Sequence, residues 1–252
     1  MKPSLGAGVL AGLLLFFAWI GYFGGDPFTF VPATTKPVPA RAHVVAIVLS
    51  GDMGFKIGMG HLVARRLAAD GIPVIGVNSL TAFAKRRTPA DATALVADAI
   101  GRAGRVDPAA RIILVGQSYG ADMLQVGLAG LKADLRAKIA FVALVVPGAT
   151  VEFRASPGEI FTFLMHEDDA LPTARALDWV PALCIHGAAE DNSLCPRLHQ
   201  ANLEVATLPG GHPLHRDDEA VHAVLIKAID AALARASPAL PAPALPTNTA
   251  MD

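Results

Sequence analysis

A serine with a glycine two residues before it and another two residues after it is the strongest candidate in this sequence for covalent chemistry. Residues 116–120 read Gly-Gln-Ser-Tyr-Gly and match the pattern G-x-S-x-G. The segment 111–115, an arginine followed by four apolar residues, leads into the motif, and a helix-like segment, 119–131, follows it. This strand–turn–helix context is typical of a nucleophile elbow, where glycines let the strand and the helix approach each other closely. Ser118 is therefore the candidate nucleophile.

A serine hydroxyl needs a neighbouring base before it becomes a useful nucleophile. His212 follows the last predicted strand in the segment Leu-Pro-Gly-Gly-His, whose glycines can bring an imidazole over the elbow. His215 is the alternative base. Four other histidines fall on predicted strand or helix bodies or precede the acid loop, namely His43, His61, His222 and His186.

The imidazole in turn needs an acid that orients it. In a fold with this elbow the acid follows the serine and precedes the histidine in the chain. The loop 187–193 reads Gly-Ala-Ala-Glu-Asp-Asn-Ser and offers both Asp191 and Glu190. We predict Asp191 as the acid and keep Glu190 as the alternative.

The tetrahedral intermediate of such a reaction carries an oxyanion that needs two hydrogen-bond donors. One predicted donor is the backbone N–H of Tyr119, the residue after the nucleophile. The other comes from the glycine-containing loop 50–55 that follows the first strand of the domain. Asp52 N–H is the first choice there, and Met53 N–H is the second.

Alternating strands and helices must position these groups. The predicted strands are 43–49, 72–77, 112–115, 139–146, 182–186 and 203–207, and the predicted helices are 57–70, 88–103, 119–131 and 217–236. Thr88 before Pro89 is a typical helix start. This order predicts an α/β fold of the α/β-hydrolase type, with a mostly parallel sheet, helices on both faces and little or no cap domain.

Hydropathy divides the 252 residues into four parts. Residues 1–25 contain an uncharged run from Leu5, which predicts a membrane anchor or a cleaved signal peptide. Residues 26–42 are expected to be a proline-rich linker, residues 43–236 the α/β-hydrolase domain, and residues 237–252 a disordered Pro/Ala-rich tail. Whether the first segment is a retained anchor or a cleaved signal peptide, we expect the domain to be exported.

Composition excludes several classes of protein. Apolar residues make up 53% of the chain, which is ample for a core and excludes a disordered protein. The net charge of −1 leaves no basic excess to neutralise phosphates, so no nucleic-acid partner is expected. Nothing in the residues indicates a cofactor or a metal.

The chain has only two cysteines, Cys184 and Cys195, and they bracket the acid loop. An exported domain lies in an oxidising compartment, where paired cysteines persist. We therefore predict a disulfide between them that holds the acid loop in place.

Several short motifs occur between Val44 and Ala236. They are the loop 50–55, the stretches 78–80 and 87–89, the elbow 116–122, the segment 184–196 and the segment 209–212. Jointly they resemble the VirJ/AcvB family of bacterial virulence proteins. The resemblance implies Ser118, Asp191 and His212 as the triad of an exported, periplasm-facing α/β hydrolase. It further implies an association with type IV secretion and hydrolysis of aminoacylated phosphatidylglycerol, notably lysyl-phosphatidylglycerol.

These observations together predict an exported serine hydrolase that cleaves an ester, with an aminoacylated phospholipid as its substrate and the membrane contacted through residues 5–25. Such a substrate carries an ammonium group, for which Asp122 and Glu190 are the candidate partners. Two alternatives remain: a general esterase or thioesterase, and a non-catalytic accessory protein of a type IV secretion system.

Overall fold

A seven-stranded sheet forms the centre of the computed structural model, which describes residues 5–155, 157 and 167–236. The spatial order is β1-β3-β2-β4-β5-β8-β9. Every neighbouring pair is parallel except β1 with β3. The strands are β1 (Phe28–Val31), β2 (Val44–Leu49), β3 (Val74–Val77), β4 (Arg111–Gln117), β5 (Ile139–Val145), β8 (Ala182–Gly187) and β9 (Leu203–Leu208). The six predicted strands are confirmed, and the sheet is that of an α/β hydrolase.

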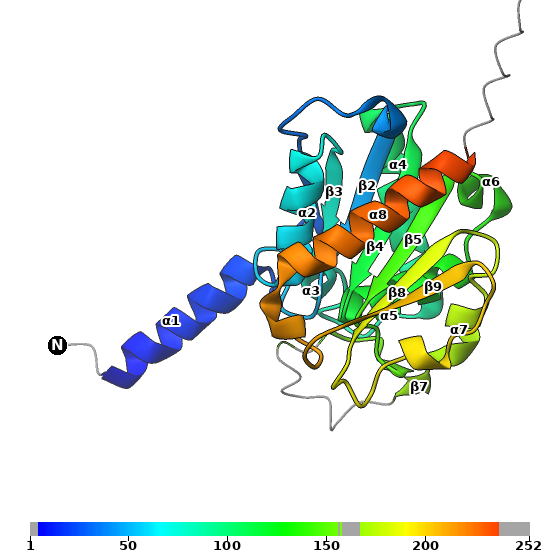
Figure 1. Ribbon diagram of the computed structural model, residues 1–252. Helices are drawn as coiled ribbons and strands as arrows, with labels where there is room; N and C mark the ends of the chain where they lie inside the picture. Colours follow the sequence, from blue (N-terminus) through cyan, green and yellow to red (C-terminus); the bar gives the residue numbers. More distant parts are fainter. Residues whose placement is uncertain (1–4, 156, 158–166, 237–252) are drawn as a thin grey trace, which may run out of the picture.

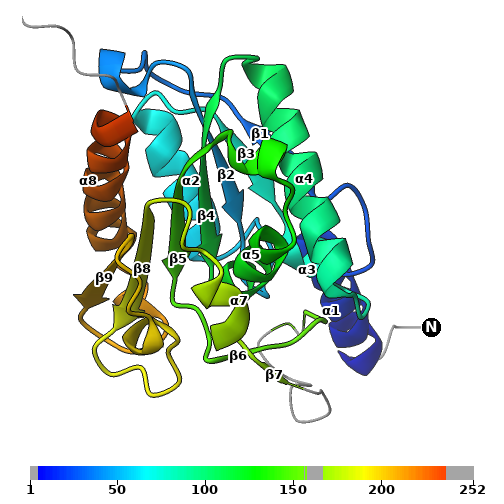
Figure 2. The ribbon, with the colours of Figure 1, turned by 90° about the vertical axis from the view of Figure 1, so that its right-hand side faces the viewer.

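Helices cover both faces of the sheet, as Figures 1 and 2 show. The helices and helical turns are α1 (Leu5–Ile20), η1 (Pro39–Arg41), α2 (Met59–Ala69), α3 (Ser79–Ala82), α4 (Pro89–Val106), α5 (Tyr119–Ala129), α6 (Ala133–Arg136), α7 (Leu171–Arg175), η4 (Cys195–Arg197), η5 (Leu214–Arg216) and α8 (Asp218–Ala236). Helices α2 and α8 lie on one face, and α4 and α5 lie on the other. The Thr88 hydroxyl accepts a hydrogen bond from Asp91 N–H, so α4 begins as predicted.

The alternation of side chains along β2 explains the two-sided core. Val45, Ile47 and Leu49 belong to the buried cluster that includes α4 and α5. Val44, Ala46 and Val48 belong to the cluster that includes α2 and α8. Successive side chains of a strand point to opposite faces, so an apolar run buries both.

The connection from β5 to β8 is the longest excursion from the sheet. Its described residues form only α7 and a two-stranded ribbon of β6 (Thr150–Val151) and β7 (Asp168–Asp169). Among these described residues no separate cap domain forms.

The expected linker 26–42 is wrong for most of its length, because the domain includes it. Phe28–Val31 pairs with β3 as an antiparallel edge strand. The Thr34 N–H donates to the Ala68 carbonyl at 2.9 Å. Arg41 holds Asp230 of α8 through two hydrogen bonds of 2.8 Å each. The folded domain therefore starts well before residue 43.

Helix α1 projects from one corner of the domain (Figure 1), yet its last turn is bound to it. Ile20 is fully buried, and its carbonyl accepts a hydrogen bond from the Asn78 side chain at 2.9 Å. Lys56 donates to the Trp19 carbonyl at 2.8 Å. In the part of the chain that the structure describes, no helix combines the length and the apolar character needed to cross a membrane. The predicted tail, 237–252, lies outside the described residues.

Candidate active site

Ser118 occupies the sharp turn between β4 and α5. Its φ of 53° and ψ of −126° lie outside the ordinary regions for a residue with a side chain, as a nucleophile elbow requires. A Cβ on Gly116 would come within 2.5 Å of the Ala121 Cα, and one on Gly120 within 2.3 Å of the Ser50 carbonyl oxygen. Both glycines of the motif are therefore required by close backbone contacts.

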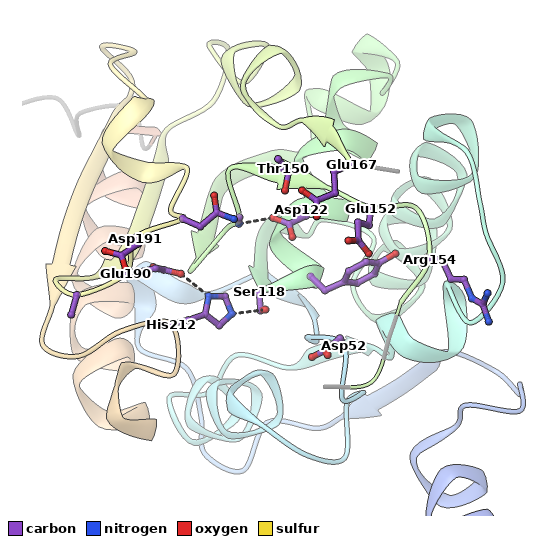
Figure 3. Close-up of a pocket in the computed structure, with 14 residues that line it drawn as sticks. Asp52, Ser118, Asp122, Thr150, Glu152, Arg154, Glu167, Glu190, Asp191 and His212 are labelled. Carbon is purple, nitrogen blue, oxygen red and sulfur yellow. Dashed lines mark hydrogen bonds and ion pairs between the residues drawn. The ribbon is translucent and has the colours of Figure 1, made fainter. Parts of the chain in front are cut away.

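A chain of hydrogen bonds runs from Ser118 through His212 to Glu190 (Figure 3). Ser118 Oγ lies 2.8 Å from His212 Nε2, and His212 Nδ1 lies 2.5 Å from Glu190 Oε1. The carboxylate can only accept, so it holds a proton on Nδ1 and leaves Nε2 free to accept the serine proton. The predicted nucleophile and base are thus brought together, and the geometry is that of a serine–histidine–acid relay.

The acid in contact with the histidine is Glu190 and not Asp191, which corrects the sequence-based choice. The turn after β8 closes with Glu190 N–H bonded to the Gly187 carbonyl at 3.1 Å, and Glu190 Oε2 accepts from Gly187 N–H at 3.2 Å. The Glu190 side chain is 4% exposed. Asp191, one residue further on, is exposed and lines the adjoining cavity.

The loop that carries His212 is held by contacts with the end of β8. A Cβ on Gly187 would meet the carbonyl oxygens of Gly210 and Gly211 at 2.5 Å, so the two loops touch through their backbones. Leu214 to Arg216 then have φ values of 48°, 53° and 59°, a left-handed turn that non-glycine residues rarely adopt. His215, the alternative base, packs against Gly210 instead of reaching Ser118.

The two residues predicted to supply the oxyanion donors, Tyr119 and Asp52, line the same cavity as Ser118. Tyr119 begins α5, so its N–H belongs to the first turn, where helical N–H groups lack intrahelical partners. The loop that carries Asp52 is fixed to the elbow by a 3.1 Å hydrogen bond from Gly51 N–H to Gln117 Oε1. Asp52 lines the cavity beside Ser118. The assignment of these two N–H groups as oxyanion donors stays a prediction.

The predicted disulfide is confirmed. Cys184 and Cys195 are bonded with a Cα–Cα distance of 5.5 Å, and both are fully buried. The bridge joins β8 to the short helix η4 and so closes the loop that contains Glu190.

An acidic cavity of about 430 Å³ opens beside Ser118. Its described lining includes six acidic side chains and one arginine, namely Asp52, Asp122, Glu152, Glu167, Glu190, Asp191 and Arg154. Three of these, Glu152, Arg154 and Glu167, come from the excursion between β5 and β8 and were not predicted. The signal that could have found them is the concentration of acidic residues in that excursion.

Asp122, a predicted partner of an ammonium group, lies in this cavity wall. Burial raises the pKa of its carboxyl well above the usual range, although a 2.9 Å hydrogen bond from Gly148 N–H acts in the opposite direction. Burial also raises the pKa of the Tyr119 hydroxyl, and the carboxylates of Asp122, Glu152 and Asp52 add to that shift. The Tyr119 hydroxyl is buried with no hydrogen-bond partner among the described residues.

A second cavity, of about 420 Å³, adjoins Ser118 and has a different character. It shares Asp52, Ser118 and His212 with the acidic cavity. Most of its other lining is apolar, from the loop after β2, the start of α2, the end of β5 and the turn after His212. The nucleophile therefore stands between an acidic space and an apolar one.

The sequence of this chain matches one protein family. Residues 43–233 match the model of a family described as bacterial virulence protein (VirJ). No curated protein matches the chain.

Solved structures with the same fold cover about four-fifths of the chain. Est1E from Butyrivibrio proteoclasticus, solved with ferulic acid, is 14% identical over 80% of this chain and 94% of its own, with a TM-score of 0.55. An alpha-beta serine hydrolase homologue from Coxiella burnetii is 12% identical over 79% of this chain and 89% of its own, with a TM-score of 0.56. A thioesterase domain from the curacin biosynthetic pathway is 15% identical over 79% and 94%, with a TM-score of 0.53. At these identities the similarity establishes the fold.

Proposed function

The chain belongs to the VirJ family of bacterial virulence proteins, and from that premise we propose that it is an exported serine hydrolase that cleaves the ester of an aminoacylated phospholipid such as lysyl-phosphatidylglycerol. The observation that carries the hydrolase part is the relay of Ser118, His212 and Glu190 at a strained elbow. The acidic lining of the adjoining cavity supports a substrate whose acyl group is cationic, because acidic side chains attract cations.

In the proposed reaction, Ser118 Oγ attacks the aminoacyl carbonyl carbon while His212 Nε2 takes the serine proton. Glu190 stabilises the imidazolium, and the N–H groups of Tyr119 and Asp52 hold the oxyanion. The intermediate collapses, the bond to the lipid alcohol breaks, and the alcohol leaves with the proton from His212. A water molecule, deprotonated by His212, then attacks the acyl-enzyme, which releases the amino acid and restores the serine hydroxyl.

The proposal places the catalytic domain on the periplasmic side, either anchored through residues 5–25 or released after signal cleavage, with type IV secretion components as further partners. The buried disulfide between Cys184 and Cys195 supports export, because disulfides persist in oxidising compartments. Digestion of the domain by protease added to intact spheroplasts tests this placement. Full protection there, with digestion only after lysis, would contradict it.

The activity itself is tested with the full chain, purified in detergent and incubated with lysyl- and alanyl-phosphatidylglycerol, phosphatidylglycerol and simple esters. We expect release of the free amino acid, measured by mass spectrometry, and its loss in Ser118→Ala. Turnover of simple esters alone would favour a general esterase or thioesterase. No Ser118-dependent turnover of any ester would favour the accessory protein.

A further inference from the structure

The apolar cavity beside Ser118 adjoins the same serine and histidine as the acidic cavity, and no step of the reaction above uses it. Its apolar lining comes from four parts of the chain and includes Met53, Ile57, Leu62, Val145, Pro213 and Leu214. Its volume of about 420 Å³ is within the range of small-molecule sites. We infer that this cavity is the subsite for the leaving alcohol of the ester, and that it takes an alkyl chain with an anionic group next to the ester. The inference rests on the proposed function.

The direction of the substrate follows from the two cavities and the position of the ester carbon. An ester carbonyl bound at Ser118 Oγ has one substituent on the acyl side and one on the alcohol side. An ammonium-bearing acyl group is favoured by the carboxylates of the acidic cavity and disfavoured by apolar walls. The alcohol must then extend into the other space that adjoins Ser118, which is the apolar cavity.

The chemistry of the leaving step points the same way. His212 must pass its proton to the alcohol oxygen as the ester bond breaks, so the alcohol lies on the histidine side of the intermediate. The residues that follow His212 directly, Pro213 and Leu214, line the apolar cavity. An alkyl chain attached to that oxygen therefore meets apolar side chains at once.

The left-handed turn after His212 adds a cation to this subsite. It buries Leu214 in the core and leaves Arg216 exposed, and both line the apolar cavity. Arg216 makes no ion pair with any of the residues that the structure describes. A guanidinium at this position suits a phosphodiester carried by the leaving alcohol.

Lysine esters of alcohols of increasing length test the direction. With methyl, butyl and octyl esters, we expect kcat/KM to rise by roughly two- to fourfold per methylene until the cavity is full, because each buried methylene improves binding by about that factor. In a second series, from the acetate to the octanoate ester of one alcohol, only the acyl chain lengthens. We expect no such rise in kcat/KM there. A flat alcohol series, or a rise confined to the acyl series, would overturn the inference.

Two leucines give a matched pair of variants. Leu62→Ser places a hydroxyl in the cavity wall and should lower the ratio of kcat/KM for the octyl ester to that for the methyl ester by about tenfold, the effect of losing about two buried methylenes. Leu95 on α4 is also half-buried but lines neither cavity, so Leu95→Ser should leave this ratio unchanged. Equal ratios in both variants would contradict the subsite.

The cationic part is tested by Arg216→Gln, with Arg235→Gln on the exposed end of α8 as its control. The first variant should lower kcat/KM for lysyl-phosphatidylglycerol a few-fold more than for lysine octyl ester, as expected for a solvent-exposed ion pair. Equal effects on both substrates would remove the anion from the proposal.

The outcomes separate the inference from the proposed function. If no lysine ester and no lysyl-phosphatidylglycerol is hydrolysed, the proposed function itself fails. If lysine methyl ester is hydrolysed but the alcohol series is flat, the function stands and the subsite is wrong.

Discussion

Glu190 and Asp191 are neighbours in the sequence, yet only one of them touches the histidine. The turn after β8 folds Glu190 back over Gly187, so its carboxylate is shielded and meets His212 Nδ1 at 2.5 Å. Asp191 has already left the turn and is exposed. A carboxylate can orient the imidazole only through such a direct hydrogen bond.

The contrast between the two carboxylates predicts unequal mutants. Glu190→Gln keeps the shape but cannot hold the proton on His212 Nδ1 in the same way, so kcat should fall on the order of 10³-fold or more. Asp191→Asn, the matched control, should change kcat little, since the carboxylate that orients His212 is that of Glu190. The measurement is steady-state hydrolysis of a simple ester, and a larger loss in Asp191→Asn would restore Asp191 as the acid.

Ser118 and His212 are expected to act as a unit. Each alanine substitution should remove most of the activity, and the double mutant should be little worse than either single mutant, because removing one partner disables the other. Single-turnover rates of Ser118→Ala, His212→Ala and the double mutant check this. Losses that multiply would mean that the hydrogen bond between the two side chains has no catalytic role.

Asp122 carries a prediction about pH. Burial raises its pKa in the folded protein, so the folded state holds a proton that the unfolded state loses above about pH 4. The stabilisation from this proton is complete below the unfolded pKa and is lost as pH rises toward the folded pKa.

Asp122→Asn removes that titration and retains an oxygen that can accept the Gly148 N–H. We expect the variant to gain stability relative to the wild type as pH rises from about 5 to 8, by at most about 1.4 kcal/mol per pH unit, because ionisation of Asp122 favours the unfolded wild type. Urea unfolding at both pH values measures it. Parallel pH profiles would show that the carboxyl is ionised in the folded protein.

At the scale of elements, the amino-terminal segment differs most from what its sequence predicts. The four residues of β1 form an antiparallel edge strand whose partner, β3, is far along the chain, and the surrounding prolines suggested a linker. The last turn of α1 binds through the buried Ile20 and through backbone carbonyls, and no side-chain pattern reveals the carbonyl contacts. The strands of the parallel sheet were predictable because they are buried on both faces and therefore read as continuous apolar runs.

The docking of α1 predicts that two aliphatic residues of this helix, Ile20 and Leu14, contribute unequally to the free energy of unfolding. Ile20 is fully buried, so Ile20→Ala should lower the free energy of unfolding by about 2–5 kcal/mol. Leu14 is 50% exposed, and Leu14→Ala should stay within about 0.5 kcal/mol. Urea unfolding of the full chain in detergent tests both, and equal effects would mean that the end of α1 is not part of the domain.

The disulfide should matter more to the acid loop than to the sheet. Cys184 and Cys195 lie 11 positions apart in the sequence, and closing a loop of this size contributes about 3 kcal/mol in the loop-entropy model. Replacing both by alanine should therefore lower the midpoint of thermal unfolding and reduce kcat through a less restrained Glu190, with the circular dichroism spectrum retained. Unchanged kcat in the double variant would limit the bridge to a stabilising role.

For the whole molecule, the fold followed from the sequence, but the character of the site did not. The strand–helix order, the elbow and the histidine loop were readable because each depends on residues close in sequence. The two cavities depend on loops that meet only in the folded chain, including Glu152 and Glu167 of the excursion after β5. Composition could not reveal them either, because opposite charges elsewhere bring the net charge to −1.

A nearly neutral molecule with a locally acidic site should show a salt dependence that follows the substrate's charge. A net charge of −1 gives little long-range steering, so attraction of a cationic ester comes from the carboxylates around the cavity. Raising NaCl from about 0.05 M to about 0.5 M shortens the Debye length about threefold. Because the attraction is then screened, kcat/KM for lysine methyl ester should fall several-fold. The diacetylated lysine methyl ester has the same skeleton without the charges, so its kcat/KM should stay nearly constant. Equal salt dependence for both esters would mean that the carboxylates do not attract the acyl group.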